Sequence, residues 1–120
     1  RMAEEWLAKH YRESNAIQGV VGASNVPERT FKRRFKTATG STLIDYLQNL
    51  RIEEAKQRLE TTETSFDEIS AEVGYENPGF FRRLFKRRTG LTPGQYRRMF
   101  SPIVLAHKQE AVLETSLLTR

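Results

Sequence analysis

The 120-residue sequence contains no cysteine, which excludes disulfides, thiolate nucleophiles and zinc sites built on cysteine. Histidine is scarce as well: the two present, His10 and His107, are far apart and form no plausible catalytic triad. Acidic pairs such as Glu53-Glu54 are adjacent, so their carboxylates point to different parts of a helix surface. No glycine-rich phosphate loop is present. We therefore predict no enzymatic activity, no cofactor and no metal site.

Long apolar runs are also missing. The mean hydropathy is −0.64, and no stretch approaches the roughly 20 apolar residues of a membrane-spanning helix. Residues 2–12 have the pattern of an amphipathic helix and do not resemble a signal peptide. A start inside a helical pattern indicates a piece of a longer chain. We expect no membrane partner, and the absence of cysteine fits a location in the reducing cytoplasm.

Positive charge is concentrated in two short segments. The net charge of the chain is +5. Segment 27–40 holds five cations and one anion, and segment 77–90 holds five cations and no anion. Segment 41–72, which lies between them, holds three cations and eight anions. This focusing indicates a polyanionic partner for the two basic segments.

The two basic segments are copies of one another at an offset of 50 residues. Such internal repetition fixes the architecture of a chain more strongly than any single motif. Each copy predicts a short basic helix that carries aromatic side chains on one face and ends at a glycine. The matching pairs are Phe31/Phe81, Arg33/Arg83, Phe35/Phe85, Lys36/Lys86, Thr39/Thr89, Gly40/Gly90, Thr42/Thr92 and Tyr46/Tyr96.

Each copy separates its cations from its apolar side chains at helical spacing. In the first copy the cations at positions 29, 32, 33 and 36 share one face, whereas Phe31, Phe35 and Ala38 lie on another, suited to a core. The second copy has Gly79 in place of Arg29. Its cationic face holds Arg82, Arg83 and Lys86, and its apolar set holds Phe81, Leu84 and Phe85. Two cationic helices in register favour binding in a groove lined by phosphates.

The rest of the pattern predicts an all-α chain with two helix-turn-helix units. We expect the first unit at 1–40, a long linker helix at 41–61, the second unit at 62–100 and a tail at 101–120. Ser65 and Glu68 predict a capping box, and the close approach of another helix would explain Gly19 and Gly22. The expected helices cover residues 2–12, 16–23, 27–39, 42–60, 66–73, 78–89 and 93–100.

Three stretches carry a resemblance to a known family. The segment 51–62 resembles the linker helix of AraC/XylS-type transcription regulators, and 69–86 with 90–98 resembles that family's C-terminal signature. The likeness covers roughly residues 3–100. Details at 75–78 and 92–94 look most like the GlxA-type branch, in which a DJ-1/PfpI-like domain precedes the DNA-binding half.

The resemblance implies about seven helices and two basic helices that enter successive major grooves of double-stranded DNA, as the output domain of a bacterial regulator. It implies that Arg29, Thr30, Lys32 and Arg33 of the first unit, and Asn77, Gly79, Arg82 and Arg83 of the second, face the bases. We assign guanine contacts first to Arg29 and Arg33. Arg82 and Arg83 are assigned guanine or phosphate contacts, and Lys36, Lys86 and Arg87 phosphate contacts. Arg34 and Arg88 lie nearer the side of each helix, where we expect them to be solvated or to cover apolar surface.

Other partners are weighed against this interpretation. A basic helical module that binds an acidic protein is the alternative. RNA is disfavoured because the aromatics serve the core and do not form an open stacking surface. A related repair-type protein with a methyl-accepting cysteine is excluded by the lack of cysteine. RNA polymerase is a common partner in the family. We expect the isolated piece to be a monomer, its parent an oligomer, and the place of action the nucleoid.

Overall fold

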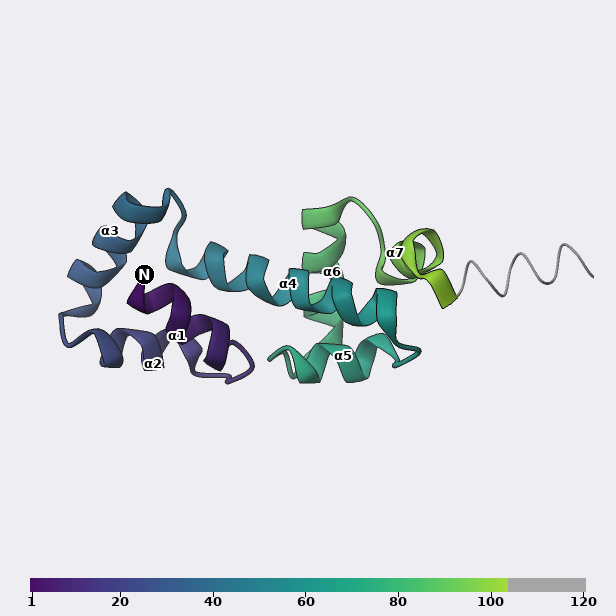
Figure 1. The fold of residues 1–120 in the computed structure, drawn as a ribbon, viewed down its shortest axis with the longest axis horizontal. Coiled ribbons are helices and arrows are strands. Elements are labelled where there is room, and N and C mark those ends of the chain that lie inside the picture. The colour runs from purple at the N-terminus through teal and green to yellow at the C-terminus, as the bar shows by residue number, and fades with distance from the viewer. Residues whose placement is uncertain (104–120) are drawn as a thin grey trace, which may run out of the picture.

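The computed structural model describes residues 1–103, and in this range it contains seven α-helices and no strand. The long helix α4 runs across the molecule, with α1 to α3 grouped at one of its ends and α5 to α7 at the other (Figure 1). The all-α prediction is therefore confirmed. Most of the predicted tail lies outside the described residues. The helices are α1 (Met2–His10), α2 (Ala16–Ser24), α3 (Glu28–Thr39), α4 (Leu43–Thr61), α5 (Phe66–Glu72), α6 (Pro78–Thr89) and α7 (Pro93–Phe100).

The helix ends follow from local sequence. Gly40 and Gly90 end the two basic helices in the left-handed region, at φ 78° and 80°, which glycine adopts without steric cost. Side-chain oxygens of Thr42, Ser65, Asn77 and Thr92 cap the helices that follow them. The complete capping box is that of Thr92 with Gln95. At Ser65 only one half of the predicted box is formed, in which the Ser65 hydroxyl accepts from the Glu68 N–H at 3.2 Å.

The core is continuous through both units and is built from the faces that the periodicity predicts. Phe31 and Phe35 of α3 are buried, as are Phe81 and Phe85 of α6. Ala38 is exposed, so the prediction that it joins the core is wrong. It lies in the last turn of α3 and lines a surface recess instead of the core. The large apolar side chains of Ile44, Met99 and Phe100 are exposed as well.

One of the two α2 glycines is explained by close packing. A Cβ on Gly19 would lie 2.4 Å from the Cη2 atom of Trp6, so the indole ring of α1 occupies that space. The Trp6 ring also stacks on His10 at a centroid distance of 4.1 Å, which places this histidine in packing. The expectation of a close approach is therefore confirmed for Gly19. It is wrong for Gly22, where a Cβ would meet nothing within 4 Å.

The two units are joined through a buried arginine on α4. Arg51 is 6% exposed, and its Nε donates to the Tyr11 carbonyl oxygen at 2.8 Å while Nη2 donates to that of Glu13 at 2.9 Å. Its guanidinium carbon lies 4.7 Å from the ring centroid of Tyr75. Tyr11 and Glu13 belong to the first unit and Tyr75 to the second. Arg51 therefore ties a loop of one unit to the turn of the other.

Candidate nucleic-acid interface

The first basic helix, α3, is fixed from beneath by its two phenylalanines. The Phe31 and Phe35 rings lie 6.2 Å apart, and Phe35 meets Tyr46 of α4 edge-on at 5.3 Å. The hydroxyl of Thr39 donates to the Phe35 carbonyl at 2.8 Å and closes the last turn. With this underside anchored in the core, the opposite face of α3 is turned to solvent. The exposed cations of that face are Arg29, Lys32, Arg33 and Lys36.

These cations carry few internal bonds. Lys32 pairs with Glu28 one turn earlier at 3.6 Å, and both side chains are about half exposed. Pairs of this kind contribute roughly 0.3–0.5 kcal/mol, so a phosphate can displace the carboxylate readily. The hydroxyl of Thr37 donates to the backbone carbonyl of Arg33 at 3.0 Å and leaves the guanidinium unengaged. The α3 face is therefore available to an anionic partner.

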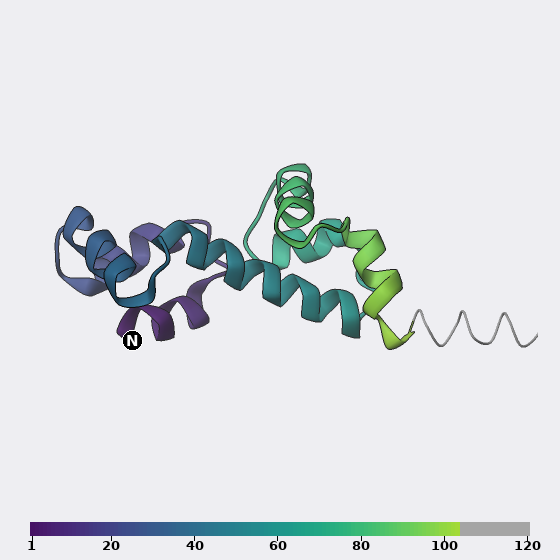
Figure 2. The same ribbon diagram turned by 90° about the horizontal axis from the view of Figure 1, so that it is seen from above.

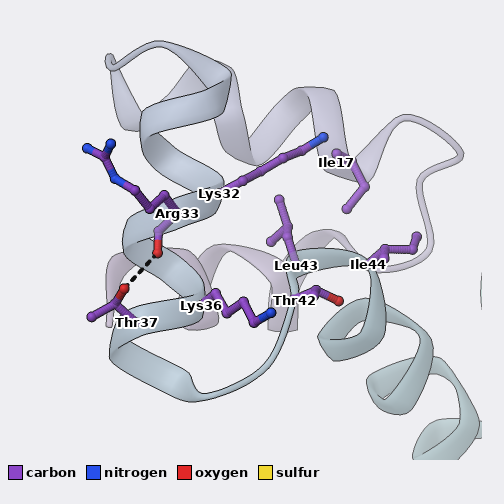
Figure 3. Close-up of a pocket in the computed structure, with 8 residues that line it drawn as sticks. All are labelled: Ile17, Lys32, Arg33, Lys36, Thr37, Thr42, Leu43 and Ile44. Atoms are coloured by element: carbon purple, nitrogen blue, oxygen red, sulfur yellow. Dashed lines mark hydrogen bonds between the residues drawn. The ribbon is translucent and has the colours of Figure 1, made fainter.

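A cleft of about 740 Å³ lies beside this face, between α2, α3 and the start of α4. Figure 3 shows Lys32 extending toward Ile17 and Lys36 toward Thr42, whereas Arg33 points outward on the other side of the helix. The floor of the cleft is apolar and its rim cationic. Such a surface suits a sugar–phosphate strand, which presents apolar sugar edges and charged oxygens together.

The second basic helix, α6, begins at a tight cap. The Asn77 Oδ1 atom accepts from the Phe80 N–H at 3.0 Å, so this oxygen is already used within the protein. A Cβ on Gly79, which corresponds to Arg29 of the first copy, would lie 3.2 Å from the same oxygen, a tight contact. The Phe80 side chain is 39% exposed beside Tyr75, and the sequence analysis did not single it out. The first turn of α6 therefore offers fewer free polar side-chain groups to a partner than the first turn of α3.

The cations of α6 are more engaged than those of α3. The Nη2 atom of Arg82 donates to Asp67 of α5 at 3.0 Å, and its guanidinium lies 5.6 Å from the Phe66 ring centroid. Arg88 donates hydrogen bonds to α4, so the expectation that it is solvated or merely covers apolar surface is wrong. Arg83, Lys86 and Arg87 remain exposed.

The structure places the eleven predicted contact residues in two groups. One group lies on α3, and the other on α6 and its cap. Figures 1 and 2 show that α3 lies beyond the first end of α4, that α6 lies alongside its later part, and that the two basic helices do not lie against each other. Nine of the residues are exposed, namely Arg29, Lys32, Arg33, Lys36, Asn77, Arg82, Arg83, Lys86 and Arg87, whereas Thr30 and Gly79 are half-buried.

The sequence did not predict the structural hydrogen bonds of three arginines that lie away from the cationic faces. Besides Arg51, Arg58 donates to Glu54 at 3.2 Å and to Glu72 of α5 at 3.1 Å. Arg97 of α7 donates to the carbonyl oxygens of Leu59 at 3.2 Å and Thr64 at 2.6 Å. In addition, burial and the carboxylate of Glu60 raise the pKa of Tyr96 to about 12, and its hydroxyl donates to that carboxylate. Sequence spacing indicates only the pair of Arg58 with Glu54, which are four residues apart on one helix. The other partners of these arginines are backbone oxygens or a carboxylate distant in the sequence.

Two helix-turn-helix units on one shared helix, each with an outward basic second helix, define a double helix-turn-helix DNA-binding domain. The family profile described as "Helix-turn-helix domain" matches residues 20–99. The chain belongs to the AraC-type helix-turn-helix DNA-binding domain family, which functions in transcription regulation.

Known proteins agree with this assignment. The chain is 32% identical over 95 residues to the bifunctional transcriptional activator/DNA repair enzyme AdaA of Bacillus subtilis, covering 79% of this chain and 45% of AdaA. It is 32% identical over 93 residues to the transcriptional activator RhaR of Salmonella dublin, covering 78% and 33%. The chain thus spans less than half of these relatives. The DNA-binding domain of AdpA, solved in complex with a target DNA, has a TM-score of 0.77 and 31% identity, covering 82% and 88%.

Proposed function

We propose that this chain binds double-stranded DNA sequence-specifically, with α3 and α6 in two successive major grooves. The observation that carries the proposal is the pair of outward cationic helices, which are separated along the single helix α4. A helix of 19 residues is about 28 Å long, and successive major grooves on one side of B-DNA repeat every ~34 Å. The linker together with the width of its partners therefore matches one helical turn of DNA.

The residues of α3 supply the stronger half of the readout. Arg29 and Arg33 are assigned bidentate contacts to guanine, since the guanidinium fork matches the O6 and N7 acceptors of that base. Thr30 and Lys32 reach neighbouring base edges, and Lys36 holds a phosphate beside the cleft. The backbone N–H groups in the first turn of α4, after Thr42, face the same strand and would bind a phosphate.

The residues of α6 supply a weaker second half. Arg83 carries the base contact, while Lys86 and Arg87 hold phosphates. Arg82 joins them once a phosphate or guanine replaces Asp67 as its acceptor. Asn77 and Gly79 offer little further readout, because the amide oxygen caps the helix and glycine has no side chain. The half-site under the first unit is therefore the better defined of the two.

The remaining proposals concern a larger parent protein and its partners. We propose that the domain is the output module of a larger regulator of the GlxA-type branch, with a DJ-1/PfpI-like domain upstream, and that its parent is oligomeric while the isolated domain is a monomer. RNA polymerase is the proposed protein partner in activation, and the bacterial nucleoid the place of action. No helix within residues 1–103 has the length and apolar character to cross a membrane.

Selection of bound duplexes from a random pool tests the proposal. We expect two short half-sites about ten base pairs apart, the clearer one protected by the first unit. The repeated selection with Arg33→Ala should lose preference at one position of that half-site. Recovery of no common sequence, or displacement of the domain from every duplex by an acidic protein at low concentration, would refute sequence-specific DNA binding and favour the acidic-partner alternative.

A further inference from the structure

Arg88 departs from the cationic pattern of the repeat. By the 50-residue offset its counterpart in the first unit is Ala38, which is exposed and has no polar side-chain atom. The cations of α6 at 82, 83 and 86 have cationic counterparts at 32, 33 and 36, whereas Arg87 corresponds to Thr37. The repeat by itself therefore leaves the role of Arg88 open, and its contacts distinguish it from the exposed Arg87.

The contacts of Arg88 show what that role is. Its Nη1 atom donates to Asn49 Oδ1 at 2.6 Å, and Nη2 donates to Asp45 Oδ1 at 3.0 Å and to Gln48 Oε1 at 2.5 Å. All three acceptors lie on α4, and the Arg88 side chain is only 25% exposed. In the part of the chain that the structure describes, these are the side-chain hydrogen bonds that link α6 directly to α4. Otherwise α6 packs mainly on α5 and α7, which in turn pack on α4.

The position of these acceptors makes the contact a link between the two recognition helices. Asp45, Gln48 and Asn49 belong to the first two turns of α4, and only residues 40–42 separate the end of α3 from the start of α4. The path from α3 through the first turns of α4 to Arg88 and α6 is therefore shorter than the path along the whole linker and back through α5 or α7. A guanidinium held by three acceptors resists both sliding and rotation of α6, because its donors lie in a rigid plane.

We propose that Arg88 is a positioning residue that sets the spacing of the two DNA half-sites by fixing α6 relative to α4. The inference rests on the proposed function, since spacing has meaning only for a protein that reads two half-sites. Arg88 makes no base contact in this account. It acts through the distance and rotation between α3 and α6, which must match one helical turn of the duplex.

The test measures affinity on duplexes in which the two selected half-sites are 9, 10, 11 or 12 base pairs apart, and on duplexes with either half-site alone. The wild-type domain should prefer one spacing. In Arg88→Ala the ratio between the best and the next spacing should fall about three- to tenfold, because a partly exposed, multiply bonded arginine contributes that much to fixing one geometry. Affinity for single half-sites should be unchanged.

Matched variants distinguish positioning from charge. The double variant Gln48→Ala/Asn49→Ala removes two acceptors without changing the net charge and should relax the spacing preference in the same way. Arg34→Ala removes one positive charge from an exposed position of α3 and should leave the spacing preference intact. Circular dichroism with thermal unfolding establishes that each variant is folded.

Two results would overturn the inference. One is an unchanged spacing preference in both folded variants. The other is an equal loss of affinity on every duplex in Arg88→Ala alone, with a shallower salt dependence, which would make Arg88 a phosphate contact. A wild-type domain that shows no spacing preference or binds no duplex specifically would instead refute the proposed function, and with it this inference.

Discussion

The Nε atom of Arg51 donates a 2.8 Å hydrogen bond to the backbone carbonyl oxygen of Tyr11, 40 residues earlier in the chain. Tyr11 directly follows the last residue of α1, whereas Arg51 lies near the middle of α4. The same guanidinium packs against Tyr75 in the turn before α6. A single side chain thus fixes three segments whose relative placement decides where the two basic helices project.

Replacement of Arg51 should be among the most destabilising changes in the domain. Arg51→Met keeps much of the side-chain volume but removes the donor to the buried Tyr11 carbonyl oxygen, while the Glu13 carbonyl oxygen keeps only the Ala16 N–H. We expect a loss of about 1–3 kcal/mol in the free energy of unfolding, which is the cost of one unsatisfied buried acceptor. Urea unfolding followed by circular dichroism measures it. A loss below 1 kcal/mol would show that water replaces the guanidinium at this junction.

The turn against Arg51 should tolerate no side chain at Gly74. This residue has φ 110°, and a Cβ would lie 2.8 Å from the Tyr11 carbonyl oxygen and 2.9 Å from Arg51 Nε. Gly74→Ala should therefore destabilise the domain by at least about 2 kcal/mol through backbone strain and collision. The control is Gly22→Ala, where the Cβ meets open space in a helix and should stabilise by about 0.5–1 kcal/mol. Similar midpoints for the two variants in thermal unfolding would contradict the structure of this turn.

Arg33 and Lys36 should have different effects on DNA binding although they are neighbours on one exposed face. Arg33→Ala should cost ~1–3 kcal/mol on a specific site and blur the preference at one base pair, because a bidentate contact is lost. Lys36→Ala should weaken binding to all sequences alike, because a phosphate contact is lost. Titrations on the selected duplex and on single-base variants of it separate the two. Equal, sequence-independent losses would reject these roles.

Asp67 should restrain the readout of the second helix through its bond to Arg82. Asp67→Ala should raise affinity and broaden or shift the base preference under α6, because Arg82 is released. Glu68→Ala provides the control: it removes the same charge from the adjacent exposed position without touching Arg82. Arg82 and Asp67 are both solvent-exposed, so the stability of the Asp67→Ala variant should change by less than about 1 kcal/mol. Identical base preferences in the two variants would show that Asp67 has no influence beyond its charge.

Affinity for DNA should fall steeply as salt is added. Each phosphate neutralised by a lysine or arginine releases a counterion and contributes a log–log slope of about −0.9. Lys36→Ala should reduce the magnitude of the slope by about one such increment, whereas Arg34→Ala should leave it unchanged. Fluorescence anisotropy across a salt series measures the slopes. A flat curve for the wild-type domain would rule out this mode of binding.

The elements that the sequence could predict are those whose causes are local. The α3 and α6 helices follow from apolar residues at positions such as Phe31 and Phe35, repeated at Phe81 and Phe85, and from glycines that end the helices. Their cations appear on the opposite face for the same periodic reason. Ala38 fits the same periodicity but is exposed, because periodicity assigns a face to every turn of a helix, whereas neighbouring helices cover only some turns.

Arg51 and Arg88 mark the part that periodicity could not supply. Both looked like further cations in a basic chain, one in a linker helix and one on the side of a recognition helix. Their roles depend on backbone carbonyls at 11 and 13 and on acceptors at 45, 48 and 49, some 40 residues away. The sequence by itself determined that there are two outward basic helices and what chemistry they present, since side-chain spacing along one helix suffices for that. Only the tertiary structure decided how those helices are held relative to each other, because that depends on bonds between residues distant in the chain.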